Sequence, residues 1–178
     1  MSGLAAGSPT KSKMCTGASH RKSVSASGTK HSPARAIEDI GDRARRKWRE
    51  LGFFCNRDDA TKVWKLVGSR SGLLRFRDLL LEYANDPSND YKSEHEHYGG
   101  YCLEIMTWSE PGFDDHAIYG SLPDLKRLAA IVENRLAVSQ AGDSIRIQNE
   151  YAANAPYALI LEVREDNFDP AQADPRFR

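Results

Sequence analysis

The spacing of hydrophobic residues changes period within the first half of the chain. Residues 61–68, Thr-Lys-Val-Trp-Lys-Leu-Val-Gly, are rich in β-branched and aromatic side chains, which is typical of a strand. Large apolar residues then recur every three or four positions, and this predicts a helix over 72–84 with Ser71 as its N-cap. Residues 85–87, Asn-Asp-Pro, should end that helix, because the residue before a proline is pushed out of helical geometry.

A period of two follows over residues 101–108, where apolar and polar side chains alternate, and it predicts a second strand. Residues 86–98 are polar and should form the loop that leads into this strand through Gly99 and Gly100. A short third strand is predicted at 116–119.

The last third of the chain predicts one helix and two strands. Ser121 and Asp124 have the spacing of a capping box, and the apolar stripe behind them continues to Leu136. Strands are expected over about 145–151 and 159–163, joined as a hairpin through 152–156, and the tail from 166 to 178 should lie irregularly over the surface.

The N-terminal residues are of a different kind. Residues 1–31 have almost no large apolar side chains and cannot offset the roughly 1–2 kcal/mol of backbone entropy lost per ordered residue, so we expect a disordered basic tail. Residues 32–57 predict an amphipathic basic helix over 33–51 followed by a linker, and 58–178 should form a single domain.

These elements, in the order β-α-β-β-α-β-β after the N-terminal helix, predict an α+β fold. The alternation of polar and apolar residues indicates that one face of the sheet is exposed to solvent and the other is covered by helices. We therefore expect a two-layer sandwich with a mostly antiparallel sheet and its helices on one face. Trp64 and Trp108 should pack in or against the core.

Charge is distributed unevenly although the whole chain is neutral. Residues 1–57 carry twelve Lys and Arg against four Asp and Glu, whereas residues 58–178 carry thirteen against twenty-one. A basic segment could contact nucleic acid, but this one has no aromatic interleaving, and a solvated basic face is the expected state. A nucleic-acid-associated protein that acts through this segment is therefore kept only as an alternative.

Several features favour a cytoplasmic protein. No run of about 18 apolar residues exists, so we expect no membrane span, and the first residues lack the apolar core of a signal peptide. The three cysteines, Cys15, Cys55 and Cys102, are odd in number and widely spaced, which argues against a disulfide framework. The sequence leaves the oligomeric state open.

Candidate chemistry gathers around the polar loop. His95 and His97, with Cys102 and His116, could be metal ligands, but no third ligand has a diagnostic spacing, so we expect no metal and no cofactor. A cysteine in an alternating strand is usually buried rather than nucleophilic, and the chain has no P-loop, GxSxG or GxGxxG motif. We expect no enzyme and assign no catalytic residue; a small metal-dependent or cysteine/histidine hydrolase using 93–102 is the alternative.

Several short motifs occur along residues 60–175, the most specific being Ser-Glu-His-Glu-His-Tyr-Gly at 93–99. The others are Glu-Tyr-Ala-Asn-Asp-Pro at 82–87, Ile-Met-Thr-Trp at 105–108, His-Ala-Ile-Tyr-Gly at 116–120, Asp-Leu-Lys-Arg-Leu-Ala at 124–129, and Phe-Asp-Pro-Ala with Ala-Asp-Pro within 168–175. In these motifs the chain resembles a family of bacterial polymorphic-toxin immunity proteins, immunity protein family thirty-two.

The resemblance implies a small cytoplasmic protein that binds and blocks a cognate toxin domain and has no turnover of its own. An acidic body suits a basic toxin, since complementary charge speeds encounter and fixes register. The polar loop and the acidic turn after the second strand are then the predicted contact. Its predicted partner-binding residues are Glu94, His95, Glu96, His97, Tyr98, Asp114, Asp115 and His116.

Overall fold

The computed structural model describes residues 33–90, 95–98 and 103–177, with side chains for 41–90 and 103–176. Residues 1–31, predicted to be disordered, lie outside the described residues. The elements are α1 (Pro33–Leu51), β1 (Phe53–Asp58), β2 (Val63–Ser69), α2 (Arg70–Asn85), η1 (Pro87–Asp90), β3 (His95–Tyr98), β4 (Leu103–Thr107), β5 (Gly112–Phe113), β6 (Ile118–Gly120), α3 (Leu122–Ala137), β7 (Ser144–Ile147), α4 (Asn149–Ala152), β8 (Ala158–Arg164), η2 (Pro170–Ala173) and η3 (Pro175–Phe177).

The strands form two four-stranded sheets instead of the single sheet expected. Sheet A has the order β1-β2-β8-β7 and sheet B the order β3-β4-β6-β5. In each sheet the two central strands are parallel and both outer pairs are antiparallel. Pairing is therefore mostly antiparallel, as predicted, and the mixture of helices and sheets confirms the α+β class.

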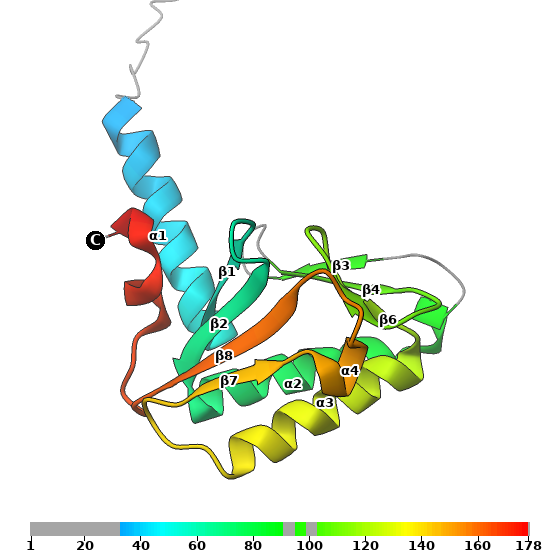
Figure 1. Cartoon of the computed structure of the whole chain (residues 1–178). Coiled ribbons are helices and arrows are strands. Elements are labelled where there is room, and N and C mark those ends of the chain that lie inside the picture. The colour runs from blue at the N-terminus through cyan, green and yellow to red at the C-terminus, as the bar shows by residue number, and fades with distance from the viewer. Residues whose placement is uncertain (1–32, 91–94, 99–102, 178) are drawn as a thin grey trace, which may run out of the picture. The chain divides into compact units, whose positions relative to one another are not determined.

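Helices α2 and α3 lie side by side on one face of both sheets (Figure 1). Their apolar stripes are buried, with Leu73, Phe76 and Leu80 of α2 fully covered. Near the other end of α2, the hydroxyl of Tyr83 lies 3.1 Å from that of Thr107 in β4. One helix thus spans the two sheets, which gives the two-layer arrangement expected from the alternating strands.

The two predicted helices of the body differ in how well their starts were located. Helix α3 begins as predicted, because the Ser121 hydroxyl accepts from the Asp124 N–H and the Asp124 carboxylate accepts from the Ser121 N–H. Helix α2 begins earlier than expected, with Ser69 rather than Ser71 as the N-cap. Strand β2 runs directly into this helix, so its last residue also caps it. No helix in the described ranges has the length and apolar character needed to cross a bilayer.

Strands β1 and β3 occupy positions where the sequence predicted no strand. Strand β1 covers the predicted linker and pairs with β2, with Phe53 opposite Gly68. Strand β3 covers the end of the predicted polar loop and pairs with β4. Both are edge strands that lack apolar alternation: β1 opens with three consecutive buried residues, Phe53, Phe54 and Cys55, and β3 is polar in sequence.

The chain between β7 and β8 also differs from the prediction. The strand expected to reach residue 151 ends at Ile147, and residues 149–152 form the short helix α4. Tyr151 on this helix is buried, and its hydroxyl donates to the carbonyl of Tyr119 over 2.7 Å. The antiparallel pairing of β7 with β8 is as expected, although a helical turn takes part in the connection.

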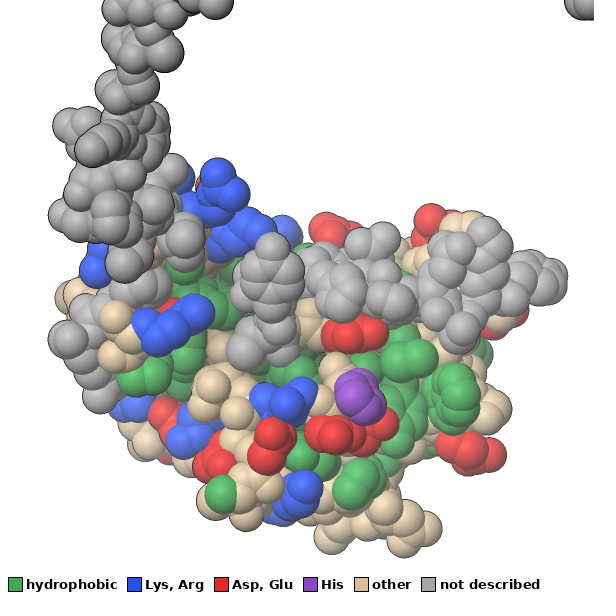
Figure 2. Space-filling model, turned by 90° about the horizontal axis from the view of Figure 1, so that it is seen from above, with side chains coloured by type: hydrophobic (Ala, Val, Ile, Leu, Met, Phe, Trp, Pro, Cys, Tyr) green, Lys and Arg blue, Asp and Glu red, His purple; other side chains and the backbone are tan. Residues whose placement is uncertain are grey.

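The two tryptophans expected in the core have opposite surroundings. Trp64 is 1 % exposed, whereas Trp108 is 52 % exposed, so the prediction for Trp108 is wrong. The cause is local: Thr107 turns its side chain toward α2, and the residues on either side of it in an extended chain point away from the core. Seen from above in Figure 2, hydrophobic, acidic and basic side chains are interspersed on the described surface.

Helix α1 is anchored to the strands and to the C-terminal tail. Trp48 is buried against Phe54 of β1, with ring centroids 5.1 Å apart, and its indole N–H donates to the Asp174 carboxylate over 2.9 Å. The tail that was expected to lie irregularly therefore holds a buried carboxylate and two short 3-10 helices.

Candidate functional site

The acidic turn predicted as a contact site joins β5 to β6. The Asp114 carboxylate accepts hydrogen bonds from the backbone N–H groups of His116, over 2.8 Å, and of Ala117, over 2.9 Å. A side chain that bonds its own backbone in this way fixes the turn. The side chains of Asp115 and His116 remain 56 % and 79 % exposed, so two of the predicted partner-binding residues lie on a rigid, accessible turn.

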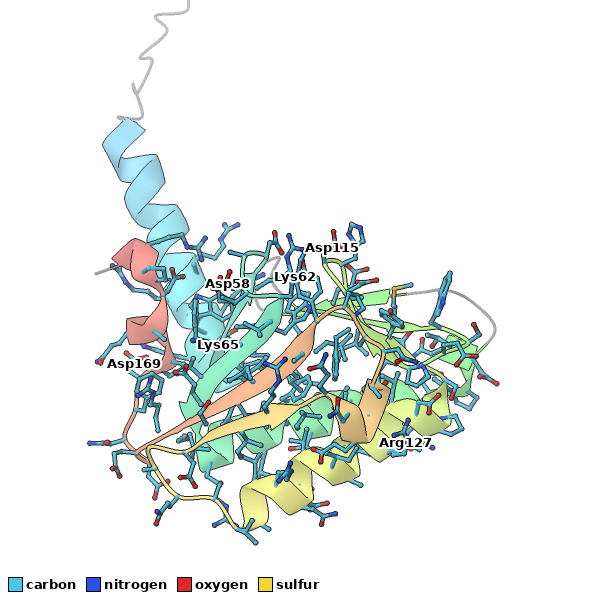
Figure 3. The ribbon with its side chains drawn as sticks, in the orientation of Figure 1. Asp58, Lys62, Lys65, Asp115, Arg127 and Asp169 are labelled. Atoms are coloured by element: carbon cyan, nitrogen blue, oxygen red, sulfur yellow. The ribbon has the colours of Figure 1, made fainter. Side chains whose placement is uncertain are left out.

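A second acidic turn joins β1 to β2. The Asp58 carboxylate accepts from the backbone N–H groups of Ala60, over 2.9 Å, and Thr61, over 3.2 Å. Hydrogen bonds from the Thr61 side chain and backbone lower the pKa of Asp58. Asp58, Lys62 and Asp115 lie on the same side of the molecule, from the tips of these two turns (Figure 3).

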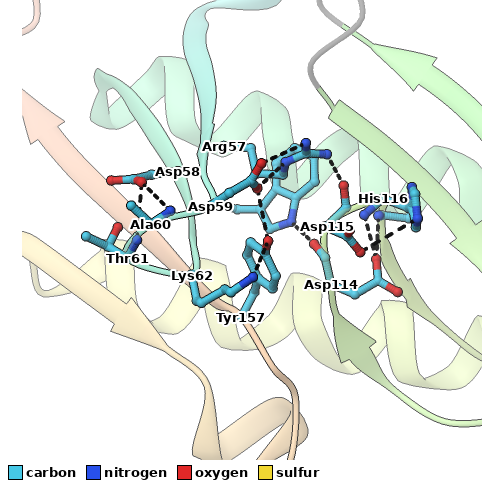
Figure 4. Close-up of polar contacts among 12 residues, drawn as sticks. Arg57, Asp58, Asp59, Ala60, Thr61, Lys62, Asp114, Asp115, His116 and Tyr157 are labelled. Atoms are coloured by element: carbon cyan, nitrogen blue, oxygen red, sulfur yellow. Dashed lines mark hydrogen bonds and ion pairs between the residues drawn. The ribbon is translucent and has the colours of Figure 1, made fainter.

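Hydrogen bonds join the two turns and thereby the two sheets (Figure 4). The Arg57 guanidinium donates to the carbonyl of Asp115, and the indole N–H of Trp64 donates to the carbonyl of Asp114 over 2.7 Å. One residue before β8, the backbone N–H of Tyr157 donates to the carbonyl of Phe113 over 3.2 Å. Hydrogen bonds from residues in and next to the strands of sheet A therefore fix the exposed turn of sheet B.

The side chains around this junction carry both signs of charge. The Asp59 carboxylate accepts from Arg57 and from the Tyr157 hydroxyl, at 2.7 and 2.9 Å, and these bonds lower its pKa. Lys62 donates to the Tyr157 hydroxyl, which raises the pKa of Lys62. Asp59 and Lys62 are thus both charged at neutral pH. We call the whole group the turn cluster; it consists of Arg57, Asp58, Asp59, Lys62, Asp114, Asp115, His116 and Tyr157.

The polar stretch at 93–98 is described only in part. Glu94 lies outside the described residues, and His95–Tyr98 are described as the backbone of β3. Tyr98 is paired with Leu103, at the end of sheet B from which β4 and its parallel neighbour β6 both start. Tyr98 therefore lies at the same end of sheet B as the turn at 114–116, whereas His95, paired with Met106, lies toward the other end. Strands β3 and β5 form its opposite edges, about 14 Å apart by strand spacing.

The alternatives to a binding role depend largely on residues outside the described ranges. Among the described residues, no group of three or more His, Cys, Asp or Glu side chains could hold a metal ion. Cys102 and the side chains of His95 and His97 are not among them, so the expectations of no metal and no hydrolase stay predictions. On α1, Arg49 pairs with Asp169 over 2.7 Å, which engages part of the predicted basic face.

A groove of about 550 Å³ lies elsewhere, on sheet A beside the C-terminal tail. Its ionised side chains are paired with one another: Glu162 accepts from Lys65 over 2.8 Å and from Arg164 over 2.7 Å. The apolar part of its lining includes Phe54 and Phe168. None of the predicted site residues takes part in it.

Sequence reasoning missed the cationic half of the turn cluster. Arg57 and Lys62 flank the acidic pair at 58–59, and the tetrapeptide Asp-Asp-Ala-Thr is typical of a turn between strands. If β1 had been predicted as a strand, this stretch would have been predicted as the turn of a hairpin with two cations at its tip. The convergence of that hairpin with the turn at 114–116 has no signal in the sequence, because it depends on contacts between distant segments.

The described geometry is that of a preformed surface with fixed charges. The carboxylates of Asp58 and Asp114 are oriented by backbone N–H groups, Arg57 by the Asp59 carboxylate, and Lys62 by Tyr157. Comparison of the chain with models of known protein families, with curated proteins and with solved structures gives no match.

Proposed function

We propose that this chain is an immunity protein that binds and neutralises a basic toxin domain by direct contact. The proposed contact surface consists of the turn cluster and strand β3. The observation that carries the proposal is the turn at 114–116, which is exposed, acidic and fixed by its own hydrogen bonds. The motif at 93–99 resembles that of polymorphic-toxin immunity proteins and adds support; within it, Tyr98 lies at the same end of sheet B as the turn.

Rigidity favours a role in binding because an ordered surface loses little conformational entropy on association. Asp58 and Asp114 each bond two backbone N–H groups, so both turns keep their shape without a partner. The net negative charge of residues 58–178 would also speed encounter with a basic domain.

The mixture of charges in the turn cluster supports selective rather than general binding of cations. Arg57 and Lys62 stand beside the exposed carboxylates of Asp59 and Asp115. A basic partner would have to avoid the two cations while it meets the carboxylates, and such like-charge penalties are a common source of specificity.

Co-expression tests this proposal. The chain is expressed with the toxin domain encoded by the neighbouring coding region, and growth is compared for the parent, an Asp115→Ala/His116→Ala variant and a Glu94→Ala/Glu96→Ala variant. The parent should rescue growth, and each double variant should do so less well. Loss of a carboxylate that becomes desolvated in the complex should cost about 2–5 kcal/mol of binding free energy.

The matched control is Glu165→Ala/Asp166→Ala, which removes two exposed acidic side chains from the segment after β8. It should rescue growth as well as the parent does. Equal rescue by all the variants would place the contact elsewhere, and failure of the parent to rescue growth would contradict an immunity function toward that toxin.

A further inference from the structure

Sheet B presents apolar side chains on the face opposite its helices. Thr107 points to Tyr83 of α2, and the alternation of β4 places its neighbour Met106 on the other face, together with Glu104. Trp108 follows directly and is 52 % exposed. A single exposed hydrophobic residue is ordinary, but several apolar side chains that share one exposed face mark a candidate contact surface.

Tyr119 extends the same surface. The strand register aligns Met106 of β4 with Tyr119 of β6 and Gly112 of β5, so the three residues form one row across the sheet. A Cβ atom at Gly112 would overlap the ring of Tyr119. The glycine therefore lets the tyrosine ring lie against β5, where it is half-buried, while the backbone N–H of Trp108 donates to the carbonyl of Gly120, the next residue of β6.

The segment that carries this apolar row is acidic. Residues 103–121 contain four acidic side chains and no Lys or Arg, and Arg57 of β1 donates to the backbone carbonyl of Asp115 at its edge. All four acidic residues, Glu104, Glu110, Asp114 and Asp115, are partly or well exposed. Tryptophan, tyrosine and methionine are enriched at the centres of protein interfaces, and charged groups at their rims.

We propose that the outer face of sheet B, formed by Glu104, Met106, Trp108 and Tyr119, is the centre of the contact with a basic protein partner. The partner presents arginine side chains, whose guanidinium groups can stack on Trp108 and Tyr119 while they pair with the surrounding carboxylates. This inference rests on the proposed function, since it identifies the toxin domain as the partner.

Charge selects this occupant over two others. A second copy of the chain on the same face would place acidic rim against acidic rim, which repels. A nucleic acid would bring phosphates to the same carboxylates and meet no cation from residues 103–121. A basic protein surface would pair with the carboxylates and stack on the aromatic side chains.

Trp108 provides a direct test in the full chain. It is 52 % exposed, while the other two tryptophans, Trp48 and Trp64, are 2 % and 1 % exposed, so acrylamide quenching of fluorescence reports on Trp108. A ten-residue peptide of alternating arginine and leucine should lower the quenching constant at low salt. The counterpart with glutamate in place of arginine should leave it unchanged. Equal protection by both peptides, or by neither, would overturn the inference.

The second test uses a catalytically inactivated form of the toxin domain. Trp108→Ala should weaken binding by about 30-fold, the size of an interface hot spot, whereas Val138→Ala, which truncates a side chain that is 86 % exposed at the end of α3, should not. Circular dichroism and thermal melting confirm that both variants are folded.

The outcomes separate the two proposals. If the parent and Trp108→Ala bind the toxin domain equally well, the outer face of sheet B is not the centre, and the immunity function stands. If the parent does not bind the toxin domain but the arginine peptide protects Trp108, the surface stands and the proposed function fails. Concentration-dependent dimerisation abolished by Trp108→Ala would identify a second copy as the occupant and overturn the inference.

Discussion

Replacing Trp48 by phenylalanine should destabilise the chain by about 1.5–3 kcal/mol, the typical contribution of a hydrogen bond to a charged group. The indole N–H donates to Asp174 over 2.9 Å, and the two side chains are 2 % and 1 % exposed, so water cannot replace the lost donor. Phenylalanine keeps part of the ring contact with Phe54. Trp48→Ala would lose both and should cost about 3–5 kcal/mol.

The pH dependence of this effect has a definite sign. Burial alone would raise the pKa of Asp174, but hydrogen bonds from Arg176 and Trp48 outweigh it and hold the pKa below its usual value. A carboxyl whose pKa is lowered by folding adds stability above its unfolded pKa, and this contribution is lost as the pH falls through the folded pKa. The difference between the parent and Trp48→Phe should therefore shrink below about pH 4.

Urea unfolding followed by far-ultraviolet circular dichroism measures both quantities. Trp108→Phe is the matched control, because the same change at an exposed side chain should shift stability by less than about 0.5 kcal/mol. The reasoning is refuted if Trp48→Phe unfolds with the same free energy as the parent at neutral pH. It is also refuted if the loss is undiminished under acidic conditions where Asp174 is protonated.

Three further predictions concern other parts of the molecule. Gly72→Ala should destabilise by about 1–3 kcal/mol in urea unfolding, although alanine favours helices, because its Cβ would overlap the carbonyl oxygen of Gly52; an unchanged midpoint would contradict this close packing. Ser121→Ala should cost about 1 kcal/mol through loss of the α3 cap, and a neutral result would mean that the capping box contributes nothing. Elemental analysis of protein purified without chelator should find no stoichiometric zinc, and zinc that is lost on His95→Ala would contradict the expectation.

Elements whose signals are local were predictable from the sequence. Helix α3 carries its capping box and its apolar stripe within a few turns, and its start was placed correctly at Ser121. Helix α1 has the predicted bounds, with the glycine at 52 in the left-handed conformation that ends many helices. The end of α2 before Pro87 follows equally from local backbone sterics.

The division into two sheets was not predictable, because it depends on which strands pair. Hydrophobic alternation identifies a strand but carries no information on its neighbour, and the parallel pairs β2–β8 and β4–β6 join strands without a direct turn between them. Edge strands such as β3 also lack the apolar face that would have revealed them.

In the candidate site, too, the features with local signals were predictable and those that depend on distant contacts were not. The turn at 114–116 was found from its own acidic residues, and the structure adds the hydrogen bonds that fix it. Arg57, Lys62 and Tyr157 were missed because their contacts join distant segments: Arg57 donates to the turn itself, whereas Tyr157 bonds Lys62 and Asp59. The prediction for Trp108 was wrong because it relied on the large apolar side chain. Thr107 points toward α2, so the next residue in the extended chain points to the surface.

Direct neutralisation is tested by a titration of toxin activity with the purified chain. The proposal expects a toxin domain in the neighbouring coding region; that domain is held at fixed concentration, and its activity is followed as the chain is added. Direct neutralisation predicts a linear fall to zero at one equivalent, with a complex that co-elutes in size-exclusion chromatography. Full toxin activity in the presence of a large excess of folded chain would contradict the account.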